Sequence, residues 1–263
     1  MPRPVIALLT DFGTRDHYVG AMRGVMLGIC PDATLADITH EIPPQDVLGG
    51  ALELGASFKY FPPATVFLAV VDPGVGSTRR GIAAEAGSYR FVAPDNGLLT
   101  MVFRDSRPAR VVELSERRYA RPEVSRTFEG RDRFAPAAAW LASGVDLGAL
   151  GQELTSWHQL EIPEPAISEG RIAGEVLRVD RFGNLVTNID RRAFDRVVNG
   201  AAVDVKTPRE SVTQVVATYA DADSGSICAL FGSSGHLEIA VSGGSAAERL
   251  GLGRGAPVMV TRR

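Results

Sequence analysis

The feature that most constrains this 263-residue chain is a set of short apolar segments that each end abruptly at an aspartate. The clearest of them is 65–71 (TVFLAVV), which runs directly into Asp72, and the segment 4–10 (PVIALLT) ends in the same way at Asp11. A short apolar run that stops at polar and glycine residues is typical of a strand buried in a parallel sheet. We therefore expect both aspartates to lie in loops that open on the same edge of one sheet.

Segments with helical periodicity alternate with these strands. Apolar residues recur at helical spacing over 16–29, and Pro31 ends that helix. The expected strands are 34–38, 81–85 and 90–93, and the other expected helices are 46–58, 97–103 and 133–143. This alternation predicts an α/β domain with a mainly parallel central sheet over residues 1–163.

The second half of the chain has a different sequence pattern. Residues 164–171 belong to a proline-containing stretch without periodicity, which we interpret as a linker. From 172 to 263 the chain consists of short β-rich runs separated by turns, at 172–180, 184–189, 202–205, 212–218, 226–230, 236–241 and 257–261. This pattern predicts a small β-barrel domain at the C-terminal end, although a sandwich also fits.

Composition excludes several classes of function. With 28 basic and 31 acidic residues the net charge is −3, and no basic run stands out, so we expect no nucleic-acid partner. No segment approaches about 18 uninterrupted apolar residues, so we expect no membrane span, and the absence of a leader-like start favours a cytoplasmic protein. The two cysteines lie far apart, and the four histidines show no zinc-binding spacing, so we expect no metal site.

The loops after the strands are the first candidates for chemistry. Asp11 and Asp72 are either site residues or turn-forming and helix-capping aspartates. Gly74 and Gly76 allow backbone N–H groups to approach a ligand, but a phosphate-binding loop is not indicated, because its Lys-Ser/Thr pair is missing. The segment 127–136 (TFEGRDRFAP) is either a surface salt-bridge loop or part of a site.

Two further clusters lie in the second half. Asp180, Phe182 and Asn184 offer a carboxylate, a ring and an amide to a base or ribose, unless they only form an Asx-rich turn. The segment 231–247 alternates a strand with two Gly/Ser turns, whose backbone either serves an adenine edge or simply forms hairpins.

Six motifs in this order resemble the S-adenosylmethionine (SAM) hydroxide adenosyltransferase family, the adenosine-forming SAM hydrolases, which are relatives of the adenosyl fluoride and chloride synthases. The resemblance implies water or hydroxide attack at the ribose C5′ of SAM, giving adenosine and L-methionine. It also implies an N-terminal α/β domain, a C-terminal β-barrel and a homotrimer with sites at subunit interfaces. The motifs extend over nearly the whole chain and are Thr10-Asp-Phe-Gly13, Pro43-Pro-Gln-Asp-Val47, Val71-Asp-Pro-Gly-Val-Gly76, Pro94-Asp-Asn-Gly97, Phe128-Glu-Gly-Arg-Asp132 and Asp180-Arg-Phe-Gly-Asn184.

The resemblance also assigns roles to residues. The catalytic Asp and Arg of the family fall on Asp72 and Arg79, and a third catalytic position, usually His, is Glu129 here. The ribose-binding Asp falls on Asp11. The other residues that we expect to bind substrate are Gln45, Gly130, Asp180, Phe182, Asn184, Ser245 and Ala246.

The chemistry of SAM fits this interpretation. The sulfonium is already a good leaving group, so the reaction needs no metal or other cofactor, only an aligned and desolvated nucleophile. Asp72 would hold or deprotonate the water, Arg79 would stabilise hydroxide character, and Glu129 would act as an orienting group or weak base. Two alternatives remain. The first is a halide or other nucleophile transferase; the resemblance disfavours it, because the fluoride synthases lack an acid at the position of Asp72 and carry an aromatic residue at the position of Gln45. The second is a non-catalytic SAM- or adenosine-binding protein.

Overall fold

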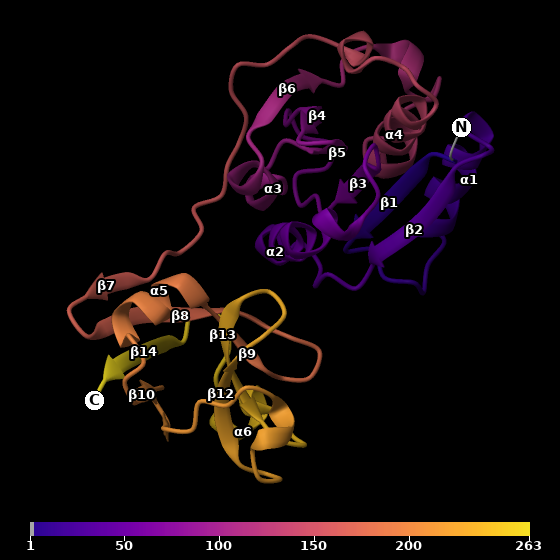
Figure 1. Cartoon of the computed structure of the whole chain (residues 1–263). Helices are drawn as coiled ribbons and strands as arrows, with labels where there is room; N and C mark the ends of the chain where they lie inside the picture. Colours follow the sequence, from indigo (N-terminus) through magenta and orange to yellow (C-terminus); the bar gives the residue numbers. More distant parts are fainter. Residues whose placement is uncertain (1–2) are drawn as a thin grey trace. The chain divides into compact units, whose positions relative to one another are not determined.

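The computed structural model describes residues 3–263, and the chain folds as two compact units that meet in sequence at Leu160 and Glu161 (Figure 1). Each unit has its own buried hydrophobic core. Among the described residues, the longest helices fall short of the length and apolar character that a bilayer crossing requires.

The first unit is built on a six-stranded sheet with the order β2-β1-β3-β5-β4-β6. The first four strands in that order pair in parallel, whereas β4 pairs antiparallel with both of its neighbours and so runs against the other five. The predicted α/β fold with a mainly parallel sheet is confirmed. The strands are β1 (Val5–Thr10), β2 (Thr34–Thr39), β3 (Val66–Val70), β4 (Gly81–Ala86), β5 (Tyr89–Pro94) and β6 (Pro108–Glu113).

Helices cover both faces of this sheet (Figure 1). On one face α1 and α4 pack with Leu8 and Leu68, and on the other face α2 and α3 pack with Leu9 and Phe67. Successive residues of a strand point to opposite faces, so a strand covered on both sides must be apolar throughout. The helices are α1 (Tyr18–Ile29), α2 (Val47–Ser57), α3 (Thr100–Asp105) and α4 (Ala135–Ala142), with 3-10 turns at Phe58–Tyr60, Arg117–Tyr119 and Leu147–Leu150.

Two helices of the first unit begin later than expected. The helix expected at 97–103 begins only at Thr100, because Gly97 has a φ of +92° and takes part in the preceding turn. The helix expected at 133–143 begins at Ala135 and follows directly on a π-helical turn, Gly130–Phe134. Such turns occur frequently at functional sites.

The second unit is an eight-stranded antiparallel sheet in which the main path runs β11-β10-β14-β8-β9-β13-β12 and β7 adds to β8. A bridge between Val215 and Ala229 of β12 nearly closes the sheet, so the predicted small β-barrel is confirmed. The strands are β7 (Ala166–Ser168), β8 (Arg171–Val179), β9 (Leu185–Asp190), β10 (Val203–Lys206), β11 (Ser211–Val212), β12 (Ile227–Phe231), β13 (His236–Val241) and β14 (Pro257–Arg262).

Three features of the second unit differ from the expected pattern. The segment expected as a linker contains β7, which pairs with β8. The run 212–218 forms a strand only at its start, and the rest is irregular apart from the bridge at Val215. Two helices were not expected: α5 (Arg191–Val198), whose buried side includes Phe194, and the single turn α6 (Ala246–Leu250); a 3-10 turn also occurs at Tyr219–Asp221.

Candidate active site

The structure brings Asp11 and Asp72 to the same edge of the first unit's sheet. They follow β1 and β3, which are parallel neighbours whose last paired residues are Thr10 and Val70. Burial raises the pKa of the Asp11 carboxyl group, and the negative charge of Asp72 raises it further, against the lowering effect of a backbone hydrogen bond. That bond comes from the N–H of Gln45 to Asp11 Oδ2, at 2.8 Å.

Gln45 is held in an uncommon backbone conformation. Its φ is +68°, a backbone angle that residues other than glycine seldom adopt. The next residue, Asp46, accepts a hydrogen bond from Gly49 and so caps α2. Because α2 fixes the loop from behind, the N–H of Gln45 stays directed at Asp11.

Asp72 also belongs to a cluster of one arginine and two carboxylates. Arg79 Nε donates to Asp72 Oδ1 at 2.8 Å, and its Nη2 donates both to Asp72 Oδ2 and, at 2.6 Å, to Glu129 Oε2. The side chains of Asp72, Arg79 and Glu129 are only 5%, 11% and 13% exposed. Burial tends to lower the pKa of Arg79, but the bonds and charges of the two carboxylates outweigh it and raise that pKa. The arginine therefore stays charged, and the cluster as a whole carries one excess negative charge.

Glycine packing holds the Asp72 loop against the segment that carries Glu129. Gly76 has a φ of +78°, and a Cβ there would lie 2.5 Å from the carbonyl oxygen of Arg126. No larger residue fits this contact. Within the loop, Ser77 Oγ donates to the carbonyl of Gly74 at 2.6 Å, which fixes the turn that precedes Arg79.

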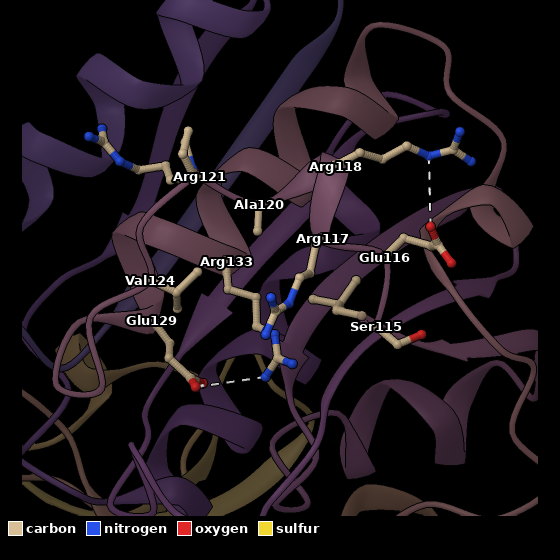
Figure 2. A pocket seen from close by; sticks show the side chains of 11 residues that line it. Ser115, Glu116, Arg117, Arg118, Ala120, Arg121, Val124, Glu129 and Arg133 are labelled. Atoms are coloured by element: carbon tan, nitrogen blue, oxygen red, sulfur yellow. Dashed lines mark ion pairs between the residues drawn. The ribbon is translucent and has the colours of Figure 1, made fainter.

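The π-helical turn positions Glu129 and Gly130. Its fully buried Asp132 accepts two hydrogen bonds from Arg131, at 2.6 and 2.7 Å, and one from the N–H of Ser125 at 2.9 Å. A Cβ on Gly130 would lie 3.4 Å from the ring of Phe12, so the backbone approaches the Asp11 loop closely. Glu129 also faces Arg133, with 3.7 Å between Oε1 and Nη1 (Figure 2).

The Pro94–Gly97 motif forms hydrogen bonds with residues at both ends of the loop that carries Asp72 and Arg79. Asn96 Nδ2 donates to the carbonyl of Val71, the residue before Asp72, at 2.8 Å. Asp95 accepts hydrogen bonds from Arg80 at 2.9 and 2.6 Å and from the N–H of His158 at 2.7 Å. These residues fix the backbone on either side of the Asp72 loop.

The second unit places Asp180, Phe182 and Asn184 around a cavity of about 620 Å³. Asp180 Oδ1 accepts from the N–H groups of Phe182 and Asn184 at 2.9 and 2.8 Å, and Oδ2 accepts from the Asn184 amide at 2.9 Å. The loop is thus an Asx-type turn, and it presents the ring of Phe182 with 77% of its surface exposed.

Ser245 and Ala246 lie against this turn. Gly183 has a φ of +82°, and a Cβ there would lie 2.1 Å from Ser245 Oγ. Ser245 caps α6 by accepting from the N–H of Glu248 at 3.1 Å, and Ala246 is fully buried. The two segments of the second half that sequence singled out are therefore one structural cluster.

Two residues of this cavity were not identified from the sequence. Tyr219 Oη donates to Glu238 Oε2 at 2.8 Å, and the Asn184 amide lies 3.4 Å from the same phenol. Burial, followed by the bond to Glu238, raises the pKa of Tyr219, so the phenol stays protonated. A sequence signal exists for Glu238: it is the one charged residue in the apolar run Leu237–Val241 of β13, and it is only 6% exposed.

Within the part of the chain that the structure describes, no three His, Cys, Asp or Glu side chains gather as metal ligands would. Cys30 and Cys228 are buried free thiols.

Comparison with known proteins identifies the relatives of this chain. It is 40% identical over 264 residues to a protein of Thermus thermophilus named (R)-S-adenosyl-L-methionine hydrolase, covering 97% of this chain and 98% of that protein. A fluorinase of an Actinoplanes species is 30% identical, with 98% of both chains covered. The crystal structure of an uncharacterized conserved protein from Thermotoga maritima matches with a TM-score of 0.93 and 38% identity, over 98% of this chain and 100% of that one.

Two family models match along the chain. The first, described as the SAM hydroxide adenosyltransferase N-terminal domain, matches residues 6–151, and the second, the C-terminal domain of that family, matches residues 174–259. Between them they contain the Asp72–Arg79–Glu129 cluster and the Phe182 cavity. The chain belongs to the SAM hydroxide adenosyltransferase family.

Proposed function

We propose that this protein hydrolyses SAM to adenosine and L-methionine by attack of water at the ribose C5′. The observation that carries the proposal is the buried cluster in which Arg79 bridges Asp72 and Glu129. Hydrolase names among relatives at 36–40% identity support the same activity.

The bond changes balance without a cofactor. A C5′–O bond forms as the C5′–S bond breaks, the electron pair stays on sulfur, and methionine leaves as a neutral thioether. Asp72 accepts the proton of the attacking water, and Arg79 stabilises the developing negative charge on oxygen. No metal has a step to perform in this reaction.

The remaining residues bind and orient the substrate in this proposal. Asp11 accepts hydrogen bonds from the ribose hydroxyls, and Gln45 and Gly130 line the same loops. In the second unit Phe182 stacks on the adenine, Asn184 offers its amide, and the backbone at Ser245 and Ala246 faces the base edge. We further propose a homotrimer with sites at subunit interfaces, and a cytoplasmic location, where free thiols such as Cys30 persist.

Charge favours water over halide as the nucleophile. Around the reacting position Asp11, Asp72 and Glu129 outnumber Arg79, so the site attracts a sulfonium cation and repels a halide anion. A halide transferase is the alternative that this balance disfavours. Incubation with SAM in the presence and absence of chloride, with identification of the nucleoside, separates the two: a 5′-chloro product would overturn the hydrolase.

The catalytic role of Asp72 is tested by Asp72→Asn, with Asp195→Asn, an exposed residue on α5, as the matched control. We expect Asp72→Asn to slow adenosine release by roughly 10²–10⁴-fold, the usual contribution of a general base, and the control to match the wild type. SAM binding by calorimetry without any methionine release would instead identify a non-catalytic SAM-binding protein.

A further inference from the structure

A second cavity in the first unit is not used by the proposed reaction. It has a volume of about 700 Å³ and opens beside Glu129, which forms part of its wall (Figure 2). Four guanidinium groups and two carboxylates line it. These are Arg117, Arg118, Arg121, Arg133, Glu116 and Glu129. The lining therefore carries an excess of two positive charges.

The arginines of this cavity are only loosely paired. Arg118 lies 3.9 Å from Glu116. Arg121 lies 3.3 Å from Asp132, a carboxylate that Arg131 already holds with two shorter bonds. Among the residues that the structure describes, Arg117 has no ion-pair partner.

Local structure directs these side chains into one space. Arg117 comes from the 3-10 turn Arg117–Tyr119 and Arg133 from the π-helical turn, and both line the cavity. The N–H of Arg121 donates to the carbonyl of Asp132 at 2.8 Å, which ties the two segments together. In the view of Figure 2, Arg117 and Arg133 both point toward Glu129.

We propose that this cavity binds a small polyanion, a molecule with two or more phosphate or carboxylate groups. Guanidinium groups match phosphate and carboxylate oxygens in pairs, and separated arginines around a cavity of this size suit several anionic groups better than one simple ion. Ala120, Pro122 and Val124 add an apolar wall suited to the carbon frame of an organic ligand.

Binding at this cavity is coupled to the Asp72–Arg79 pair through Glu129. One oxygen of Glu129 faces Arg133 and the other bonds Arg79. A polyanion that engages Arg133 withdraws it from Glu129, so the full negative charge of Glu129 acts on Arg79. The negative charge of the polyanion itself also acts on the reacting groups. The exposed charge of Glu129 and the charge of the polyanion both disfavour negative charge on the attacking oxygen, so binding lowers kcat.

The binding half of this inference is tested without SAM. Pyrophosphate and citrate, the phosphate and carboxylate probes, are titrated into the protein by calorimetry at constant ionic strength. Arg117→Gln is compared with Arg107→Gln, a control at another exposed arginine of the first unit. We expect at least one probe to bind, and Arg117→Gln alone to weaken it by roughly tenfold or more. No binding by either probe, or equal binding by both variants, overturns the site.

The coupling half rests on the proposed hydrolase function and is tested by steady-state kinetics. The bound probe is expected to lower kcat several-fold with KM for SAM unchanged, in the wild type and Arg107→Gln but not in Arg117→Gln, whose basal activity is intact. A rise in KM alone would make the cavity part of the substrate site and overturn the inference, and an unchanged kcat at saturating probe would overturn the coupling. A protein that binds the probe but releases no adenosine at all would refute the hydrolase function and leave the binding site standing.

Discussion

Arg79 Nη2 lies 2.6 Å from Glu129 Oε2 and donates to the Asp72 carboxylate with the same nitrogen. The family resemblance predicts a histidine at this position, where this chain has Glu129. In this position the Glu129 carboxylate accepts a hydrogen bond from Arg79, in addition to the bonds that Arg79 makes with Asp72, and so helps to hold the guanidinium in place. We therefore regard Glu129 as a positioning residue that acts through Arg79.

Substitution of Glu129 tests this role. Glu129→Gln removes the charge-assisted hydrogen bond that holds the Arg79 guanidinium. We expect this loss of positioning to outweigh the removal of a negative charge, so kcat falls by about 10–100-fold. Glu129→His is expected to retain more activity than Glu129→Gln and to add a titration near pH 6.5 to the kcat profile, because imidazole changes charge there. The pH dependence of kcat is the measurement. Unchanged kcat and pH profile in both variants would remove Glu129 from the mechanism.

Phe182 is expected to contribute binding rather than chemistry. Loss of one base–aromatic stack is typically worth about 1–3 kcal/mol, so Phe182→Ala should raise KM for SAM by roughly 5–150-fold with little change in kcat. Tyr60, which is 82% exposed in the first unit, provides the control Tyr60→Ala. An equal KM in the two variants would exclude stacking on Phe182.

Gly183 tests whether the Asp180 turn must contact Ser245. Gly183→Ala combines a strained φ of +82° with a Cβ placed 2.1 Å from Ser245 Oγ, whereas Gly200→Ala has a φ of +77° and open space. Both variants bear the backbone strain, but only the first displaces the turn. We expect a rise in KM for SAM in Gly183→Ala alone, measured with both variants shown to be folded by circular dichroism.

Asp132 links the π-helical turn to stability against acid. Burial alone would raise its pKa, but the hydrogen bonds from Arg131 and Ser125 lower it below the ordinary value. Because the folded pKa is the lower one, the stabilisation is fully present above the unfolded value of about 3.9 and is lost as the pH falls through the folded pKa.

We therefore expect Asp132→Asn to lose about 3–5 kcal/mol of unfolding free energy at neutral pH and to depend less on pH below about pH 4 than the wild type. Urea unfolding at pH 7 and at about pH 3 measures both effects. The control is Asp105→Asn, which breaks the exposed pair with Lys59 and should cost about 1 kcal/mol or less. Parallel acid profiles for Asp132→Asn and the wild type would contradict this account.

The sheet and its aspartate loops could be predicted because strands buried on both faces leave uninterrupted apolar runs. β1 and β3 are such strands, and the polar residues that end them mark the site edge. The other strands of the first unit gave weaker signals. The edge strand β6 (PARVVE) is short, contains two charged residues and shows no regular alternation of buried and exposed positions, so the sequence pattern does not predict it.

The geometry of the site could be predicted only in part. Asp72 and Arg79 lie in one short loop, which keeps them close in space, but the approach of Glu129 depends on a π-helical turn that has no sequence signature. The left-handed conformation of Gln45 is imposed by the contact with Asp11 and by α2, not by the residue itself. Tyr219 reaches the Phe182 cavity through tertiary packing across 35 residues from Asn184, which local patterns do not reveal.

The central claim, attack of water at C5′, is tested most directly by the origin of the oxygen atom in the product. SAM is incubated with the protein in oxygen-18-labelled, chloride-free buffer, and the products are analysed by mass spectrometry. The account predicts one labelled oxygen in adenosine, at the 5′-hydroxyl, and none in methionine. Unlabelled adenosine, or label in methionine, would contradict it.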